Sequence, residues 1–185
     1  MRTFIAIPLA EDSHRLLEQL QNQLRAAAAE VRWTSTASIH LTLKFLGEID
    51  PAVVGKTADR LRTESRALAP FTLSLGGLGA FPTIQNPRVV WCGVSGDIEQ
   101  LGLLQHKVEQ ECTRLGFAPE ERPFHPHLTL GRVRGRRNLH RLAECIKIGS
   151  DSASALTVSR FNIYKSTLTP RGAIYDILEP IELSP

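Results

Sequence analysis

The tetrapeptide His-Leu-Thr-Leu occurs twice in this chain, at residues 40–43 and again at residues 127–130. In each copy polar and apolar residues alternate, which is typical of a β-strand with one buried face. Side chains two positions apart on a strand share a face, so the His and Thr of each copy point one way and the Leu residues point into the core. The chain is therefore expected to present two imidazoles and two hydroxyls to a common cleft.

The segments around the two tetrapeptides repeat as well. Phe4 precedes His40 by 36 residues, and Val90 precedes His127 by 37. The first cycle predicts strand 4–7, helix 13–29, a tetrapeptide strand ending at residue 47, helix 51–68 and strand 71–75. The second predicts strand 88–94, helix 97–115, the other tetrapeptide strand, helix 138–146 and strand 156–164, followed by a last strand over 173–178. This repeat indicates two β-α-β-α-β lobes related by a pseudo-two-fold axis.

The length of the chain and the positions of its glycines and capping residues predict its domain organisation. A chain of 185 residues fits a single domain, residues 1–185, made of two packed lobes. Gly76, Gly77 and Gly79 predict loops between the lobes. Asp12 or Ser13 is expected to cap the first helix.

Composition excludes several classes of protein. The three cysteines include no C-x-x-C pair, which argues against a disulfide framework or a thiolate zinc site and favours reduced thiols in the cytoplasm. No apolar run approaches the ~20 residues that a membrane helix requires. A net charge of +3 suits an anionic substrate and also suits many proteins without one. We therefore predict a cytoplasmic protein with no membrane segment.

Two imidazoles across one cleft suit acid–base chemistry without a metal. The pKa of free imidazole is near 6.5, so at neutral pH one ring can accept a proton while the other donates one. The threonine hydroxyls can donate hydrogen bonds to the oxygens of a bound phosphate. The residues alone leave open which histidine is the acid and which is the base.

A metal-dependent alternative arises at the second tetrapeptide. His125 and His127 lie two residues apart, as two metal ligands on one strand face would. A metal site also needs a third protein ligand, and no carboxylate lies near the histidines in either strand. We therefore predict no metal and no cofactor, and a structural or substrate-proximal role for His125.

The motif segments resemble a known family. Residues 39–48 and 124–132 resemble the paired signatures of the two-histidine (2H) phosphoesterases. The opening residues 2–7 and the closing pattern Ser166-x-Leu168-Thr169-Pro170-x-Gly172-x-x-Tyr175 are similar to the LigT-like bacterial branch, the RNA 2′,3′-cyclic phosphodiesterases. The resemblance implies a bilobal α+β fold, in which two antiparallel or mixed sheets line a central cleft and the helices lie outside. It also implies metal-independent hydrolysis of an RNA 2′,3′-cyclic phosphate end to a 2′-phosphomonoester.

The resemblance assigns roles to individual residues. His40 matches the proton donor to the leaving 3′ oxygen, and His127 matches the proton acceptor from the attacking water. Thr42 and Thr129 would hold the phosphate, and Arg132 matches the family's arginine after the second motif. The expected partner is RNA with a 2′,3′-cyclic phosphate end, or a cyclic nucleotide, bound by a monomer.

Strand parity raises a question about Arg132. It lies five residues after His127, so a regular strand would aim its side chain at the opposite face. A bulge beside Gly131 would turn the side chain back toward the phosphate, and both arrangements remain open.

The same parity predicts the places of two residues after the first motif. Lys44 is expected to share a face with His40 and Thr42 and to supply positive charge at the cleft. Phe45 occupies the place that corresponds to Arg132, and we expect it in the core rather than as a base-stacking platform, with an edge bordering the cleft.

Other interpretations stay open at this point. A basic run suits either RNA phosphates or a solvated loop; it comprises Arg132, Arg134, Arg136, Arg137 and Arg141. The same histidines would also serve RNA ligation through 2′–5′ linkages, which is the hydrolytic step reversed. A third interpretation is a non-catalytic module that binds RNA ends or nucleotides.

Overall fold

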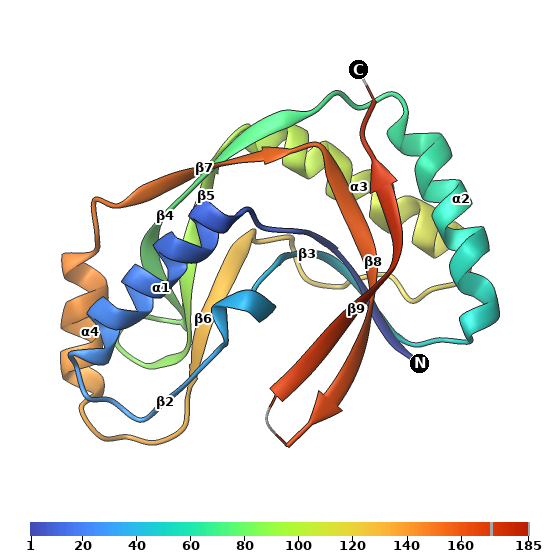
Figure 1. The fold of residues 1–185 in the computed structure, drawn as a ribbon. Coiled ribbons are helices and arrows are strands. Elements are labelled where there is room, and N and C mark those ends of the chain that lie inside the picture. Colours follow the sequence, from blue (N-terminus) through green and yellow to red (C-terminus); the bar gives the residue numbers. More distant parts are fainter. Residues whose placement is uncertain (171, 185) are drawn as a thin grey trace.

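The structure is a computed structural model, which describes residues 1–170 and 172–184 (Figure 1). Its elements, in chain order, are β1 (Arg2–Ile7), α1 (Glu11–Arg25), β2 (Val31–Trp33), η1 (Thr36–Ser38), β3 (Leu41–Glu48), η2 (Pro51–Val53), α2 (Val54–Ser65), β4 (Phe71–Pro82), β5 (Pro87–Gly96), α3 (Ile98–Arg114), β6 (His127–Val133), α4 (Leu139–Ile148), β7 (Ala153–Val158), β8 (Arg160–Thr169) and β9 (Gly172–Glu182). Most of the predicted elements are present, with shifted ends.

The strands form two sheets in which every pairing is antiparallel. Sheet A has the order β3-β1-β8-β9, and sheet B has the order β2-β6-β5-β4-β7. Helices α2 and α3 contact sheet A, whereas α1 and α4 contact sheet B (Figure 1). Each sheet therefore has one face covered by helices, which confirms the predicted α+β class with the helices outside.

The predicted strand over 156–164 is wrong, because this segment contains two strands in different sheets. β7 ends at Val158 in sheet B, and β8 begins at Arg160 in sheet A. In the same way β4, the third strand of the first cycle, lies in sheet B beside β5. The two cycles thus exchange their third strands, and the triplets β3-β1-β8 and β6-β5-β4 correspond to each other.

The glycines predicted as a loop between the lobes lie inside β4 instead. The register with β5 shifts between Gly76 and Leu78, at Gly77, which has a φ of +73°. A Cβ on Gly79 would lie only 2.2 Å from the indole ring of Trp91 on the neighbouring strand. These glycines therefore permit an irregular register and a close packing contact rather than a loop.

The first helix differs from its prediction at both ends. It begins at Glu11 with Ala10 as the N-cap and no capping side chain, so the prediction of Asp12 or Ser13 as cap is wrong. It ends at Arg25, and the following turn leads into β2. Strand β2 is three residues long, too short for hydrophobic alternation to reveal it.

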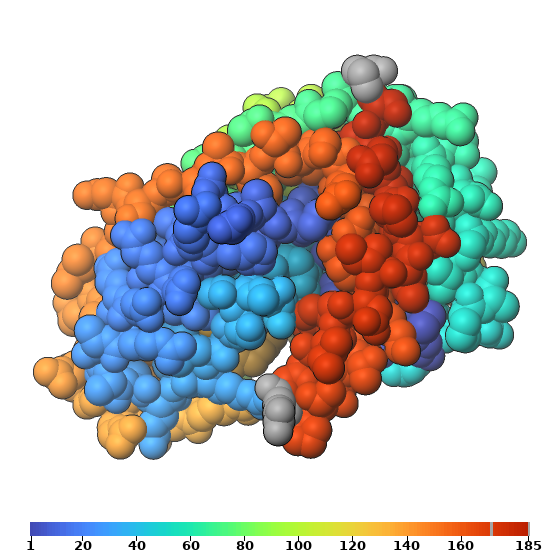
Figure 2. Space-filling view, viewed as in Figure 1, coloured from blue at the N-terminus to red at the C-terminus, as the bar shows by residue number. Residues whose placement is uncertain are grey.

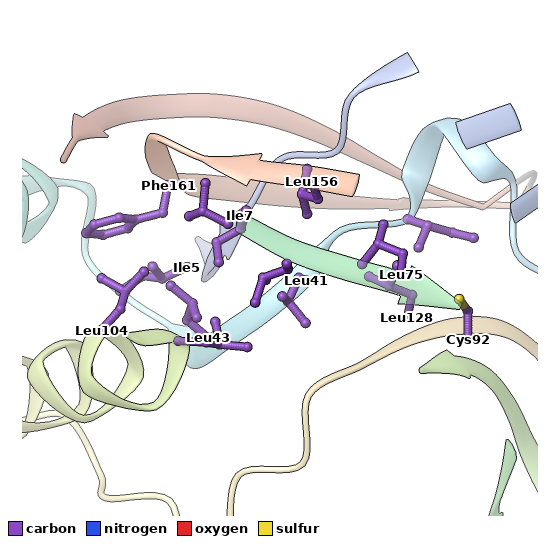
Figure 3. Packing of buried hydrophobic residues seen from close by; sticks show 14 of the residues in the cluster. Ile5, Ile7, Leu41, Leu43, Leu75, Cys92, Leu104, Leu128, Leu156 and Phe161 are labelled. Atoms are coloured by element: carbon purple, nitrogen blue, oxygen red, sulfur yellow. The ribbon is translucent and has the colours of Figure 1, made fainter. Parts of the chain in front are cut away.

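The leucines of both tetrapeptides lie in the core, as predicted. Leu41, Leu43, Leu128 and Leu130 are all buried in one hydrophobic cluster with residues of both sheets. Figure 3 shows the first three of them in this cluster. Burying a leucine side chain contributes about 1.5–3 kcal/mol relative to leaving it in water. The motif strands are therefore anchored by their apolar faces, which leaves the polar faces for chemistry.

The structure also describes the cysteines and the helices to which the compositional expectations refer. All three cysteines are free. Burial raises the pKa of the Cys92 and Cys112 thiols to about 12, so these thiols stay protonated at neutral pH. None of the helices in the described part of the chain combines the length and the apolar character needed to span a membrane.

Candidate active site

The two motif histidines are held by the same kind of hydrogen bond. Nδ1 of His40 lies 3.1 Å from the carbonyl oxygen of Ser38, and Nδ1 of His127 lies 2.7 Å from that of His125. A carbonyl oxygen only accepts hydrogen bonds, so Nδ1 donates in both cases. In the neutral rings Nε2 is then the atom left free to accept a proton. His125 takes part through its backbone carbonyl.

Strand β3 contains a bulge directly after Thr42. Thr42 pairs with Ala6 on β1, whereas Lys44 pairs with Ile5, so Leu43 is the extra residue. An extra residue reverses the alternation of faces beyond it. Lys44 therefore points to the face opposite Thr42.

The prediction that Lys44 supplies charge at the cleft is thus wrong. The residue is only 4% exposed, and Nζ donates to both carboxylate oxygens of Glu109 at 2.8 Å and to the carbonyl oxygen of Ala118 at 2.9 Å. Lys44 joins β3 to α3 beneath the sheet.

The bulge also decides the place of Phe45. This residue pairs with Phe4, on the same face as Ala6 and Thr42, and its ring centroid lies 6.1 Å from that of Phe4. It is 63% exposed, so the expectation of a core position is wrong. Phe45 lies instead on the face that carries Thr42.

Strand β6 contains a bulge at the same point of its motif. Thr129 pairs with Trp91 on β5, and the register then skips Leu130, so that Arg132 pairs with Val89. Trp91 and Val89 are two residues apart and share a face of β5. Arg132 therefore lies on the face of Thr129, as the bulged alternative requires, and the extra residue is Leu130, directly before Gly131.

His40 lies among aromatic rings of sheet A. Its imidazole stacks on Phe4 with ring centroids 4.5 Å apart, meets Tyr175 edge-on at 5.0 Å, and lies 5.9 Å from Tyr164. Burial lowers the pKa of His40 to about 4, and the hydrogen bond to Ser38 acts in the opposite direction. His40 is therefore neutral at pH 7 in the free protein.

His127 has aromatic neighbours of its own on sheet B. Phe81 meets it edge-on at 5.0 Å between ring centroids, and Trp91 lies at 6.4 Å. The indole N–H of Trp91 is buried and has no hydrogen-bond partner among the described residues. None of these aromatic contacts was predicted, because each comes from a strand distant in sequence.

Tyr175 connects the two halves of the site. It lies on β9 of sheet A, in contact with His40, and burial raises the pKa of its hydroxyl while the charges of Arg2 and Arg132 act in the opposite direction. Arg132 belongs to β6 of sheet B, so its charge reaches the surroundings of His40. Figure 2 shows the surface hollowed between the blue segment that contains β2 and η1 and the red hairpin formed by β8 and β9.

The remaining predictions concern a metal and the basic run. In residues 1–170 and 172–184 no group of three or more His, Cys, Asp or Glu side chains is arranged to hold a metal ion, so His125 and His127 have no third ligand there. The loop after β6 is fastened through its backbone, since the N–H of Arg134 donates to the carbonyl of Glu30 at 2.7 Å. Arg136, Arg137 and Arg141 are exposed around this loop.

Comparison with known proteins relates this geometry to a family. The family model described as LigT like Phosphoesterase matches residues 7–91 and 93–175. The RNA 2′,3′-cyclic phosphodiesterase of Methanothermobacter thermautotrophicus is 35% identical over 184 residues, 99% of each chain. The protein of the same name from Thermotoga maritima is 36% identical over 179 residues, 96% of this chain and 93% of the relative.

Solved structures extend the likeness to the whole fold. TT0787 of Thermus thermophilus superposes with a TM-score of 0.79 at 26% identity, covering 99% of this chain and 98% of the other. LigT of E. coli in complex with 3′-AMP gives a TM-score of 0.76 at 26% identity, covering 100% and 98%. The predicted LigT-like fold is confirmed, and the chain belongs to the LigT-like phosphoesterase family.

Proposed function

We propose that this protein is an RNA 2′,3′-cyclic phosphodiesterase, which opens the cyclic phosphate at an RNA 3′ end to a 2′-phosphomonoester. The proposal is supported above all by the matched pair of histidines, each with Nδ1 bound to a carbonyl two residues earlier and Nε2 without a hydrogen-bond partner among the described residues. The names of the relatives with 35% and 36% identity support the same reaction.

In the proposed reaction the two histidines move protons in opposite directions. Nε2 of His127 accepts a proton from water as the water oxygen bonds to phosphorus. The bond between phosphorus and the 3′ oxygen breaks, and the protonated Nε2 of His40 donates its proton to that oxygen. This division of roles follows the family resemblance, and each transfer typically contributes about 10²–10⁴-fold in rate.

The surroundings of His40 make its acid role depend on the substrate. With a pKa of about 4 in the free protein, the ring carries no proton on Nε2 at pH 7. A bound cyclic phosphate carries a negative charge, and an opposite charge a few ångströms away favours the imidazolium form. His40 would therefore become a proton donor only when the anion is bound.

Three other side chains would hold the phosphate. The hydroxyls of Thr42 and Thr129 can each donate a hydrogen bond to a phosphate oxygen, and the guanidinium of Arg132 can donate two. The proposed reaction uses no metal and no cofactor.

We also propose that the protein acts as a monomer in the cytoplasm. Both histidines belong to one chain, so the site is complete without a second copy. The free cysteines support a reducing compartment.

The proposal is tested with purified protein and 2′,3′-cyclic AMP in the presence of EDTA. We expect hydrolysis to 2′-AMP with a bell-shaped dependence of kcat on pH. Release of 3′-AMP would overturn the assignment of the leaving oxygen, and activity that EDTA abolishes would overturn the metal-free reaction. Absence of hydrolysis with both the nucleotide and a cyclic-phosphate oligoribonucleotide would overturn the proposed function.

A further inference from the structure

Two arginines lie directly opposite each other beside the proposed site. Arg32 on β2 pairs with Arg132 on β6 in the antiparallel register of sheet B. Residues directly opposite in such a register share a face of the sheet. Arg32 therefore lies on the face that carries Arg132 and Thr129, whereas its neighbours Val31 and Trp33 pack against the core.

This arrangement is unfavourable for the protein alone. Like charges directly opposite on neighbouring strands repel each other and destabilise the sheet. In the described part of the chain neither guanidinium forms an ion pair or a hydrogen bond, and Arg32 is exposed. The carboxylate closest in sequence belongs to Glu30, and its Oε2 accepts the backbone N–H of Arg137 at 3.5 Å. The pair is therefore arranged to receive an anion from outside.

The place of the pair relative to the histidines indicates which anion this is. Arg132 lies on the face of β6 that carries Thr129, which is proposed to hold the cyclic phosphate, and its charge acts on Tyr175, which contacts His40. Arg32 lies one strand further out, on β2, which is the edge strand of sheet B and borders the hollow in Figure 2. A cyclic mononucleotide has one phosphate and would leave Arg32 without a partner. An RNA chain has a second phosphodiester on the 5′ side of its terminal nucleoside.

We propose that Arg32 binds the phosphodiester on the 5′ side of the terminal nucleoside, so that the site selects RNA chains over cyclic mononucleotides. This inference rests on the proposed function and names a residue that determines the specificity of the same site. Arg132 would face the cyclic phosphate, and Arg32 would face the next phosphate of the chain. The repulsion between the two guanidiniums is then relieved when both phosphates are bound.

The test compares two substrates in three proteins. The substrates are 2′,3′-cyclic AMP and the dinucleotide ApA with a 2′,3′-cyclic phosphate end. The proteins are the wild type, Arg32→Gln and the control Arg66→Gln, which changes an exposed arginine at the end of α2. We expect Arg32→Gln to lower the ratio of kcat/KM for the dinucleotide to kcat/KM for the mononucleotide about tenfold, as for one lost hydrogen bond to a charged group. The control is expected to keep the wild-type ratio.

Two further readouts separate this role from a structural one. Loss of one phosphate contact should reduce the salt slope of dinucleotide binding by about 0.7, and the slope for the mononucleotide should not change. The Tm of Arg32→Gln should equal or exceed that of the wild type, because the substitution removes a like-charge pair.

A wild-type ratio in Arg32→Gln, whether both substrates lose activity equally or neither does, would overturn the inference and leave the proposed function standing. A wild-type protein that hydrolyses neither substrate would overturn the proposed function itself.

Discussion

The half of the site around His40 and the half around His127 have the same backbone plan and different surroundings. In both halves Nδ1 of the histidine is bound to the carbonyl two residues earlier, and a bulge follows the threonine of the motif. His40, however, stacks on Phe4 and burial lowers its pKa to about 4. The neighbours of His127 contact its ring only edge-on or at a tilt.

The bulges extend this comparison to the residues that follow. Phe45 and Arg132 occupy corresponding positions, two residues after the extra leucine, and both lie on the face of the motif threonine. One half therefore places an exposed aromatic ring where the other places a guanidinium. The two bulges place both side chains on the threonine face, whereas the residue type at this position is aromatic in one half and cationic in the other. In the proposed reaction the two identical motifs would perform opposite proton transfers in these different surroundings.

Removing either histidine is the strongest way to test this division. His40→Ala and His127→Ala should each lower kcat on 2′,3′-cyclic AMP by about 10²–10⁴-fold, since each removes one proton transfer. Each variant should also lose one limb of the bell-shaped pH profile, and the two should lose different limbs. His106→Ala, on the exposed face of α3, is the control and should keep wild-type kinetics. Wild-type turnover in either variant would remove that histidine from the mechanism.

The burial of His40 should be visible in the stability of the protein. Its pKa is about 4 in the folded state against 6.5 in the unfolded chain, so the unfolded state binds the proton first as the pH falls. The stabilisation that comes from keeping His40 neutral in the folded state is complete above pH 6.5. About 3 kcal/mol of the unfolding free energy is lost as the pH falls from 6.5 to 4. Urea unfolding of the wild type and His40→Gln over this range measures the difference. Parallel pH curves for the two proteins would contradict the lowered pKa of His40.

Phe45 and Arg132 occupy corresponding positions, so substituting each of them compares the two halves of the site directly. Arg132→Gln should lower kcat/KM by about 10–100-fold, because a charged hydrogen bond to phosphate contributes about 1.5–3 kcal/mol. Phe45→Leu should change kcat/KM by less than about threefold and the unfolding free energy by less than about 0.5 kcal/mol, since the ring is exposed. Steady-state kinetics on 2′,3′-cyclic AMP and urea unfolding give these values. Equal losses would show that the two positions contribute alike.

Gly79 leaves room for the ring of Trp91, an aromatic neighbour of His127. A Cβ added to Gly79 would lie 2.2 Å from the ring of Trp91, so Gly79→Ala should displace the indole and destabilise the fold by about 1–3 kcal/mol. Gly55→Ala in α2 is the matched control, because a Cβ there meets nothing within 4 Å. It should stabilise the protein by about 0.5–1 kcal/mol. Thermal unfolding of both variants checks the pair, and equal shifts would exclude the role of Gly79.

Local patterns predicted most elements and the motif residues, and they failed where pairing between distant strands decides. The alternation in residues 40–43 correctly placed the leucines in the core. It failed directly afterwards, because the bulge at Leu43 arises from the register with β1 and has no signature in the period of two. The single strand predicted over 156–164 failed similarly, since nothing in its apolar pattern marks the change of sheet after Val158.

By itself the sequence determined that two histidine-threonine strands exist and that their leucines face a core, because alternation along a strand is a local property. It also carried the resemblance to the family. Only the tertiary structure decided that Lys44 is buried, that Phe45 and Arg132 share the faces of the threonines, and that Arg32 faces Arg132. These outcomes depend on which strands become neighbours and in which register, and that is settled by the packing of segments far apart in the chain.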